Sequence, residues 1–295
     1  SGSGRKLFSG GEITPLGLKL GADYNDPEWE SVMDSVKFDE AVRVTGTASW
    51  TISPIDSVGK PKTSEYDGPA QVRSFNAGDN PGTGFPCGTV LAQTWSTTLG
   101  YNFGINYGKE MSSKGVDGAY AFGCNIHRSP FQGRNYEYLS ECGNLTAYML
   151  TSMVRGLQNT GKYPFLKHLA IAETEHEREA MYTWLSEQTL REIYLKPFQD
   201  VIQKANCVGV MSSYNRIGGI WTGGSEHLLT GILRYEWGFN GAVITDYADH
   251  VNFMNGAQSN RAGGNLGLNT NWDKVSGFSN PTQASSARLQ HRLRE

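Results

Sequence analysis

The sequence predicts an α/β fold with parallel strands, and among such folds it favours a (β/α)8-type TIM barrel, with allowance for an irregular or incomplete ring. Strand-like and helix-like segments alternate from about residue 95 to residue 246, which is typical of right-handed βαβ units. A doubly wound sheet also fits this alternation. The barrel is favoured because polar residues follow several strand-like segments, where barrels build their active sites. These are His127-Arg128, Lys167-His168, Ser212 to Tyr214, and Asp246.

The expected elements follow from the spacing of apolar residues and from turn signals. A first helix should begin near Asn25–Glu28, and residues 54–89, rich in Pro, Gly and Asp, should form a long loop system. Further helices are expected at 95–114, 145–160 and 177–205, and after an N-cap at Ser225. Strands are expected within 115–123, 163–172, 207–215 and 241–249.

Length and charge limit the classes of partner. A chain of 295 residues with a net charge of −3 can bury a core and has no basic excess for nucleic acid or an anionic membrane. No apolar run approaches the roughly 18 residues of a membrane span. Four scattered cysteines, Cys87, Cys124, Cys142 and Cys207, suggest reduced thiols and a cytoplasmic location.

The start of the chain, SGSGRKLFSGG, lacks the apolar core of a signal peptide and reads as an engineered scar. We therefore expect residues 1–14 to be this scar with an irregular segment. Residues 15–295 should then form a single barrel domain.

Two motifs point to other chemistries and fail in detail. The stretch GLQNTGKY, residues 156–163, matches a phosphate-binding loop until Tyr163 stands where Ser or Thr would bind magnesium. It also follows a helix rather than a strand, so a helix end and a turn are expected. His176-Glu177 begins a zinc-binding HExxH pattern, but Ala180 replaces the second histidine. We expect no metal and no cofactor.

Asp246 is the main candidate for chemistry. The run Ala242–Thr245 resembles a buried strand, yet it ends on this carboxylate. Asp246 either caps the following helix or is a nucleophile. Lys167-His168 is either a strand end that reaches solvent or a pair of donors in a polar pocket. GRNYEYLSE, residues 133–141, is either a salt-bridged loop or a subsite for a polyol.

Several motifs in collinear order resemble the catalytic barrel of glycoside hydrolase family 3, the β-glucosidase and β-xylosidase group. The resemblance covers roughly residues 15–270. The matching stretches are YDGPAQVR, TVLAQTW, NIHRSPFQGRNYEYLSE, LKHLA, GVMSSYNRIGG, LLTGILRYEWGFNGAVITDYAD and RAGGNLGLN. One such motif is weak evidence, whereas the ordered series is specific.

The resemblance implies a retaining mechanism on terminal β-linked glucose or xylose, with Asp246 as the nucleophile. Arg134, Lys167 and His168 would donate hydrogen bonds to sugar hydroxyls, and Asp67 would accept them. The resemblance further implies that the subsite is shaped by Arg73, Met211, Tyr214 and, as a wall replacing the more common Trp, Tyr247.

The pattern departs from the family where the proton donor is concerned. The family's general acid/base often lies on a second, α/β sandwich domain, for which this length leaves no room, so an excised or engineered barrel is expected. Ala172 stands where Asn is common, and Glu173, Glu175 and Glu177 are as well explained by a solvated loop as by a site. The alternative is a sugar-binding or scaffold barrel with little or no catalysis. A small carbohydrate is the expected partner, and an exposed apolar face could support a homo-oligomer.

Overall fold

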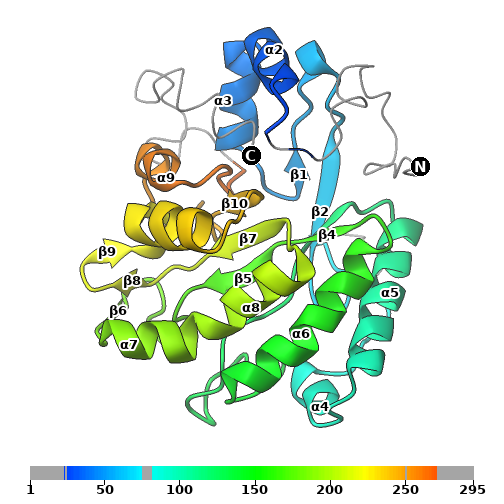
Figure 1. Cartoon of the computed structure of the whole chain (residues 1–295), viewed down its shortest axis with the longest axis vertical. Coiled ribbons are helices and arrows are strands. Elements are labelled where there is room, and N and C mark those ends of the chain that lie inside the picture. Colours follow the sequence, from blue (N-terminus) through cyan, green and yellow to red (C-terminus); the bar gives the residue numbers. More distant parts are fainter. Residues whose placement is uncertain (1–22, 24, 75–81, 250, 271–295) are drawn as a thin grey trace.

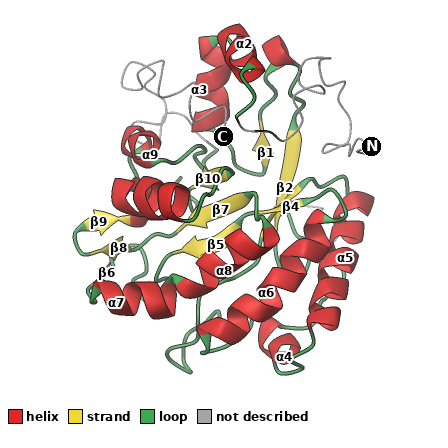
Figure 2. Cartoon of the chain, viewed as in Figure 1, coloured by secondary structure: helices red, strands yellow, loops and turns green. Residues whose placement is uncertain are grey.

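The structure is a computed structural model that describes residues 23, 25–74, 82–249 and 251–270. The predicted scar, residues 1–14, lies outside the described residues. Figures 1 and 2 show a central group of strands with helices packed around it. Within the described residues, no helix combines the length and the apolar character needed to cross a bilayer.

Parallel strands form most of the central ring. β2 (Thr63–Asp67), β3 (Gly118–Tyr120) and β4 (Tyr163–Pro164) pair in that order, all parallel. β5 (Leu166–Leu169), β7 (Gly209–Ser212) and β10 (Ala242–Ile244) form a second parallel set. Only Phe165 separates β4 from β5, and a parallel bridge from Lys167 to Gly123 continues the pairing. The two sets are therefore one continuous sheet.

Backbone hydrogen bonds close this sheet on itself. Ile244 forms a parallel bridge to Leu266, and the Gly267 amide donates to the Thr45 carbonyl at 2.8 Å. The Ala48 amide in turn donates to the Gly267 carbonyl at 2.9 Å. β1 (Thr51–Ile52) then pairs with β2 and completes the ring. The predicted TIM-barrel-like fold is confirmed, and its irregularity is this β1–β2 pair, which is antiparallel.

Two long helices form where the sequence predicts them. α5 (Thr97–Ser113) and α6 (Gly143–Gln158) correspond to the helices expected at 95–114 and 145–160. They lie side by side with α8 (Lys196–Ala205) on the outside of the ring (Figure 1). A Cβ atom at Gly104 would lie 2.1 Å from the Met153 carbonyl oxygen, so α5 and α6 are in near-backbone contact.

The other helices have 10 residues or fewer, and η4 packs on the same outer core as α5, α6 and α8. The Ser225 hydroxyl accepts a hydrogen bond from the Leu228 amide at 3.3 Å, while Glu226 stands at the N-cap position of helix η4, one residue after the predicted cap. The bounds of these helices are α2 Glu28–Ser35, α3 Phe38–Gly46, η1 Asp56–Val58, α4 Gly88–Ala92, η3 Thr222–Gly224, η4 His227–Glu236 and α9 Gly256–Ala262.

The prediction of a long helix at 177–205 is wrong over residues 177–186. β6 (Tyr182–Thr183) instead pairs with β8 (Arg216–Ile217), which pairs with β9 (Ile220–Trp221) in a small separate sheet. Helical structure begins only at α7 (Glu187–Thr189) and continues through η2 (Leu190–Tyr194) into α8. Pairing with a distant strand overrides the local helical pattern here.

The long loop system predicted over residues 54–89 contains a strand that was not predicted, β2. Thr63 and Glu65 are buried, the first two residues of β2 pair with β1, and its last three residues pair with β3. The polar sequence of this strand resembled a loop, but its last residue, Asp67, pairs with Lys167 beside the site.

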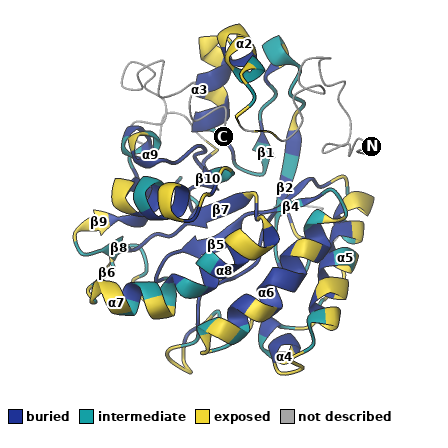
Figure 3. Cartoon of the chain, viewed as in Figure 1, coloured by how far each residue is buried: buried dark blue, intermediate teal, exposed yellow. Residues whose placement is uncertain are grey.

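Figure 3 shows that buried residues, in dark blue, predominate in the central strands. The core has two main parts. One lies between the ring and helices α5, α6, α8 and η4. The other fills the ring and includes Tyr120, Phe165, Met211 and Ile244 from successive strands. Alternate strand residues thus point inward or outward, as in a packed barrel.

Candidate active site

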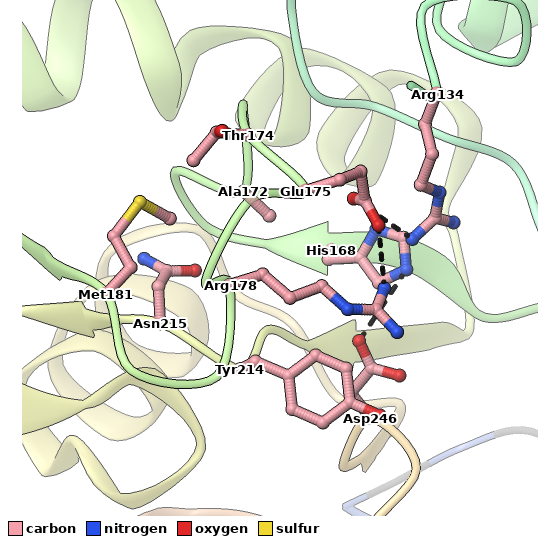
Figure 4. A pocket seen from close by; sticks show the side chains of 10 residues that line it. All are labelled: Arg134, His168, Ala172, Thr174, Glu175, Arg178, Met181, Tyr214, Asn215 and Asp246. Carbon is pink, nitrogen blue, oxygen red and sulfur yellow. Dashed lines mark hydrogen bonds and ion pairs between the residues drawn. The ribbon is translucent and has the colours of Figure 1, made fainter. Parts of the chain in front are cut away.

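A pocket lies at the carboxyl ends of the parallel strands (Figure 4). Its walls come from the loop after β3, from the segment after β5, from the end of β7 and from the residues after β10. The lining residues are Arg134, His168, Ala172, Thr174, Glu175, Arg178, Met181, Tyr214, Asn215 and Asp246.

Asp246 is held rigidly at the end of its strand. One carboxylate oxygen accepts a hydrogen bond from the Tyr247 amide at 2.8 Å, and the Thr245 hydroxyl donates to the Asp246 carbonyl at 2.8 Å. The residue is 9% exposed. Burial raises the pKa of Asp246, while Arg134 and Arg178 act in the opposite direction. The carboxylate is therefore poorly hydrated, which suits a nucleophile.

His168 faces Asp246 as a neutral hydrogen-bond donor. Its Nε2 lies 3.7 Å from Asp246 Oδ2, and its Nδ1 lies 3.3 Å from the Tyr138 hydroxyl. Burial and, after it, the charges of Arg134 and Lys167 lower the pKa of His168 well below its usual value. Burial raises the pKa of Tyr138, so its hydroxyl keeps its proton and can donate to or accept from Nδ1, whereas the ionised Asp246 carboxylate beside Nε2 can only accept a proton. We assign the imidazole proton to Nε2 on this basis, pointing at the pocket.

Asn125 fixes the backbone on which His168 stands. Its side chain accepts from the His168 amide at 2.7 Å and donates to the His168 carbonyl at 3.0 Å. The same amide group donates to Glu173 Oε1 at 3.2 Å. Burial raises the pKa of Glu173 to about 7. These buried hydrogen bonds hold the backbone at the end of β5, and with it His168, in a fixed position.

Lys167 connects two carboxylates beside the pocket. Its Nζ lies 3.3 Å from Asp67 Oδ1 and 3.6 Å from Glu137 Oε2, and it donates to the Gly68 carbonyl at 3.0 Å. Arg134 donates from Nε to Glu137 Oε1. Burial alone would raise the pKa of Glu137, but Lys167 and Arg134 outweigh it and lower the pKa.

Asp67, Lys167, Glu137 and Arg134 form a row of alternating charges, and this row continues across the pocket. Arg134 lies 3.8 Å from Glu175, and the other oxygen of Glu175 lies 3.1 Å from Arg178. The Arg178 guanidinium stacks on the Tyr214 ring, 4.6 Å from its centre. The Tyr214 hydroxyl donates to the Tyr247 carbonyl at 2.7 Å.

The structure brings most of the predicted site residues together. Arg134, His168, Tyr214 and Asp246 line one pocket, and Lys167 and Asp67 join it through the ion pairs above. The other three predicted residues lie apart from the pocket lining. Met211 packs in the core inside the ring, Arg73 pairs through its backbone with Asp67 and has an exposed side chain, and Tyr247 hydrogen-bonds to Asp249 at 2.9 Å.

Sequence reasoning missed Arg178 and did not choose Glu175. Both belong to the segment that follows β5, which folds back over the strand ends. Their signal in the sequence was present, because the charged run Glu173–Arg178 directly follows a strand that carries Lys167-His168. No cluster of three metal-ligating side chains occurs among the residues that the structure describes.

Known proteins resemble this chain in sequence and in structure. Residues 73–270 match the model of the glycosyl hydrolase family 3 N terminal domain. A beta-glucosidase from Rhizobium radiobacter is 38% identical over 221 residues, which are 74% of this chain and 27% of that protein. Beta-glucosidase A from Butyrivibrio fibrisolvens is 38% identical over 193 residues, 65% of this chain and 23% of its own length. The chain therefore spans about a quarter of these relatives.

Solved structures agree with the fold. Beta-glucosidase 3B from Thermotoga neapolitana, in complex with alpha-D-glucose, superposes with a TM-score of 0.82 at 29% identity, covering 90% of this chain and 41% of that one. The beta-glucosidase from Kluyveromyces marxianus in complex with glucose gives 0.82 at 28% identity, covering 90% of this chain and 33% of its own. The matched family model, with these relatives, shows that the chain belongs to glycosyl hydrolase family 3.

Proposed function

We propose that this chain carries the nucleophile side of a retaining β-glycosidase site for terminal β-linked glucose or xylose. The observation that carries the proposal is the Asp246 carboxylate, fixed at a strand end in a pocket lined by His168 and Arg134. In the first step an Asp246 oxygen forms a bond to the anomeric carbon while the bond from that carbon to the leaving oxygen breaks. Water then cleaves the glycosyl ester.

The charged row beside Asp246 suits the binding of sugar hydroxyls. Lys167, Arg134 and the His168 Nε2 proton are donors, and Asp67, 32% exposed at its side chain, is an acceptor open to the pocket side of Lys167. Hydrogen bonds made by donors and acceptors that are shielded from water in this way become stronger as charge develops on the sugar ring. Neutral sugars fit this site because its cations are already paired with carboxylates.

The proton donor for the leaving oxygen is proposed to lie in a part of the enzyme outside the described residues. Glu175 is the other carboxylate that lines the pocket, and it is engaged by Arg134 and Arg178. The relatives are beta-glucosidases of which this chain covers about a quarter. We also retain the proposal of a cytoplasmic protein, which the free state of its cysteines supports.

The test uses 2-deoxy-2-fluoro-β-D-glucosyl fluoride, whose fluoride leaves without a proton donor. Intact-protein mass spectrometry should show one covalent fluoroglucosyl group, and peptide mapping should place it on Asp246. Asp246→Asn should abolish labelling. Asp249→Asn is the matched control, because Asp249 is a neighbouring acid held by Tyr247 and Thr270, and it should still be labelled. A rise in thermal midpoint with glucose but no labelling would support the sugar-binding alternative instead.

A further inference from the structure

The segment Ala172–Met181 brings a third cation over the nucleophile. Figure 4 shows Arg178 reaching from this segment across the pocket, between Glu175 and Asp246. The ends of the segment are anchored, since Ala172 follows β5 and Met181 precedes β6. Arg178 therefore belongs to the pocket through the fold of the chain and not through a chance surface contact.

Two contacts fix the position of the Arg178 guanidinium. Glu175 Oε2 lies 3.1 Å from Nη1, and the Tyr214 ring lies beneath the guanidinium plane at 4.6 Å. Glu175 is itself tied to Arg134 at 3.8 Å. A planar guanidinium held by a carboxylate on one edge and a ring on its face has few alternative positions.

Two arginines among the pocket-lining residues, Arg134 and then Arg178, favour the anionic form of the Asp246 carboxyl. His168 is neutral, and the Tyr214 hydroxyl, which donates to the Tyr247 carbonyl, also lies within hydrogen-bond reach of the Asp246 carboxyl without adding a charge. Lys167 on β5 is paired with Asp67 and Glu137, and Arg134 is paired with Glu137. From its own segment Asp246 receives the Tyr247 amide hydrogen bond. Arg178 is the second arginine that lines the pocket, and it comes from a different segment from Arg134.

We infer that Arg178 is a positioning residue whose guanidinium, fixed by Glu175 and the Tyr214 ring, keeps the buried Asp246 carboxyl in its anionic form. The inference deepens the proposed function, because only the anion attacks the anomeric carbon. It differs from a sugar-binding role, since it acts on Asp246 in the absence of any ligand.

The direct test is the titration of the Asp246 carboxyl in the ligand-free full chain. Aspartate carboxyl carbons are labelled with ¹³C, and the Asp246 signal is assigned by its loss in Asp246→Asn. We expect Arg178→Gln to raise the pKa of Asp246, because a positive charge that favours the anion is removed. Arg178→Lys, which keeps the charge, should restore most of the wild-type titration. Arg191→Gln removes a charge paired with Glu187 and Glu236 on the outer helices and should leave it unchanged.

Two results would overturn the inference. One is an Arg178→Gln titration that superposes on that of the wild type. The other is an equal shift in Arg178→Gln and Arg178→Lys, which would indicate repacking of the segment rather than loss of charge. Circular dichroism confirms that each variant is folded, and the Lys variant remains informative if the Gln variant does not fold.

A second readout links the inference to chemistry. In Arg178→Gln, the rate of labelling by the fluorosugar fluoride should fall roughly tenfold more at about pH 5 than at about pH 8. Loss of the positive charge raises the pKa of Asp246, so a smaller fraction of this carboxyl is ionised at the lower pH. If the wild-type chain is not labelled at all, the proposed function fails while the titration still decides the role of Arg178.

Discussion

The orientation of a single imidazole illustrates how this site is preset. His168 presents Nε2 to Asp246 because the Tyr138 hydroxyl occupies Nδ1 and because Asn125 binds both polar groups of the His168 backbone. None of these contacts needs a ligand. The donor is therefore in place without a ligand, which under the proposed function would reduce reorganisation during the reaction.

Tyr138→Phe tests this arrangement. Loss of the hydroxyl frees Nδ1 to carry the proton, so fewer molecules present a donor to the pocket. We expect the rate constant for labelling by the fluorosugar fluoride to fall about fivefold, which corresponds to a hydrogen bond of about 1 kcal/mol. Tyr136→Phe is the control, because Tyr136 lies in the same loop and is 52% exposed. Equal rates in the two variants would contradict the assigned tautomer.

Glu173 gives the protein a pH-dependent stability. Burial raises its pKa from 4.5 to about 7 in the folded state, so the folded chain holds a proton that the unfolded chain has lost at intermediate pH. The contribution of Glu173 to stability therefore declines as pH rises from about 4.5 to about 7. The full decline is about 3 kcal/mol, from about 1.4 kcal/mol per pKa unit.

Glu173→Gln should remove this contribution. The free energy of unfolding, measured by urea titration between about pH 5 and pH 8, should decline less steeply with pH than that of the wild type. Glu141→Gln changes an exposed acid in the loop after β3 and should keep the wild-type slope. If the free energies of unfolding of Glu173→Gln and the wild type changed with pH at the same slope, the Glu173 carboxyl would not titrate between about pH 5 and pH 8.

At the scale of elements, close helix packing supports the wall of the ring. A Cβ atom at Gly104 of α5 would meet the Met153 carbonyl oxygen at 2.1 Å and the Leu157 amide nitrogen at 2.7 Å, both backbone atoms of α6. Such atoms cannot move aside as a flexible side chain can. The two helices must separate to admit even a methyl group.

Gly104→Ala should therefore destabilise the fold by about 1–3 kcal/mol despite the gain of about 1 kcal/mol in helix propensity. Gly231→Ala is a matched control in helix η4, where the nearest contact to an added Cβ is an ordinary 3.7 Å. That variant should be neutral or slightly stabilising. The measurement is the urea midpoint of each variant, and equal destabilisation of both would contradict the packing argument.

The same elements show what a sequence can predict. α5 and α6 were predictable because their apolar stripes face the core directly. The segment before α8 was not, because β6 depends on pairing with β8, more than thirty residues later. In the site, Asp246 and His168 follow recognisable strands, whereas Arg178 reaches the pocket only through the path of a loop, which carries no periodic signal.

At the scale of the whole molecule, a buried arginine ties the last part of the ring together. Arg234 of helix η4 donates to the carbonyls of Gly241 at 3.2 Å and Gly263 at 2.8 Å and to Asn265 Oδ1 at 2.9 Å. Asn265 Oδ1 also accepts from the Val243 amide at 2.7 Å. One side chain thus joins a helix, β10 and the segment that pairs with β10.

Arg234→Met should lower the free energy of unfolding by about 3 kcal/mol, because several buried carbonyl groups lose a charged donor at once. Arg155→Met is the control. Arg155 donates to the Lys204 carbonyl at the surface, and its replacement should change stability by less than about 1 kcal/mol. Guanidinium denaturation followed by tryptophan fluorescence measures both. Similar losses would indicate that Arg234 does not hold the ring.

The way in which the ring closes determines when, during synthesis, the pocket beside Asp246 can form. Thr45 and Ala48 hydrogen-bond to Gly267, so an early segment of the barrel cannot complete its pairing until residue 267 has been synthesised. A nascent chain on the ribosome can form α5, β3 and α6 while this gap stays open. The pocket beside Asp246 takes its final shape only after residue 267 has emerged, and until then Thr45, Ala48 and the edge of β10 that pairs with Leu266 lack their hydrogen-bond partners.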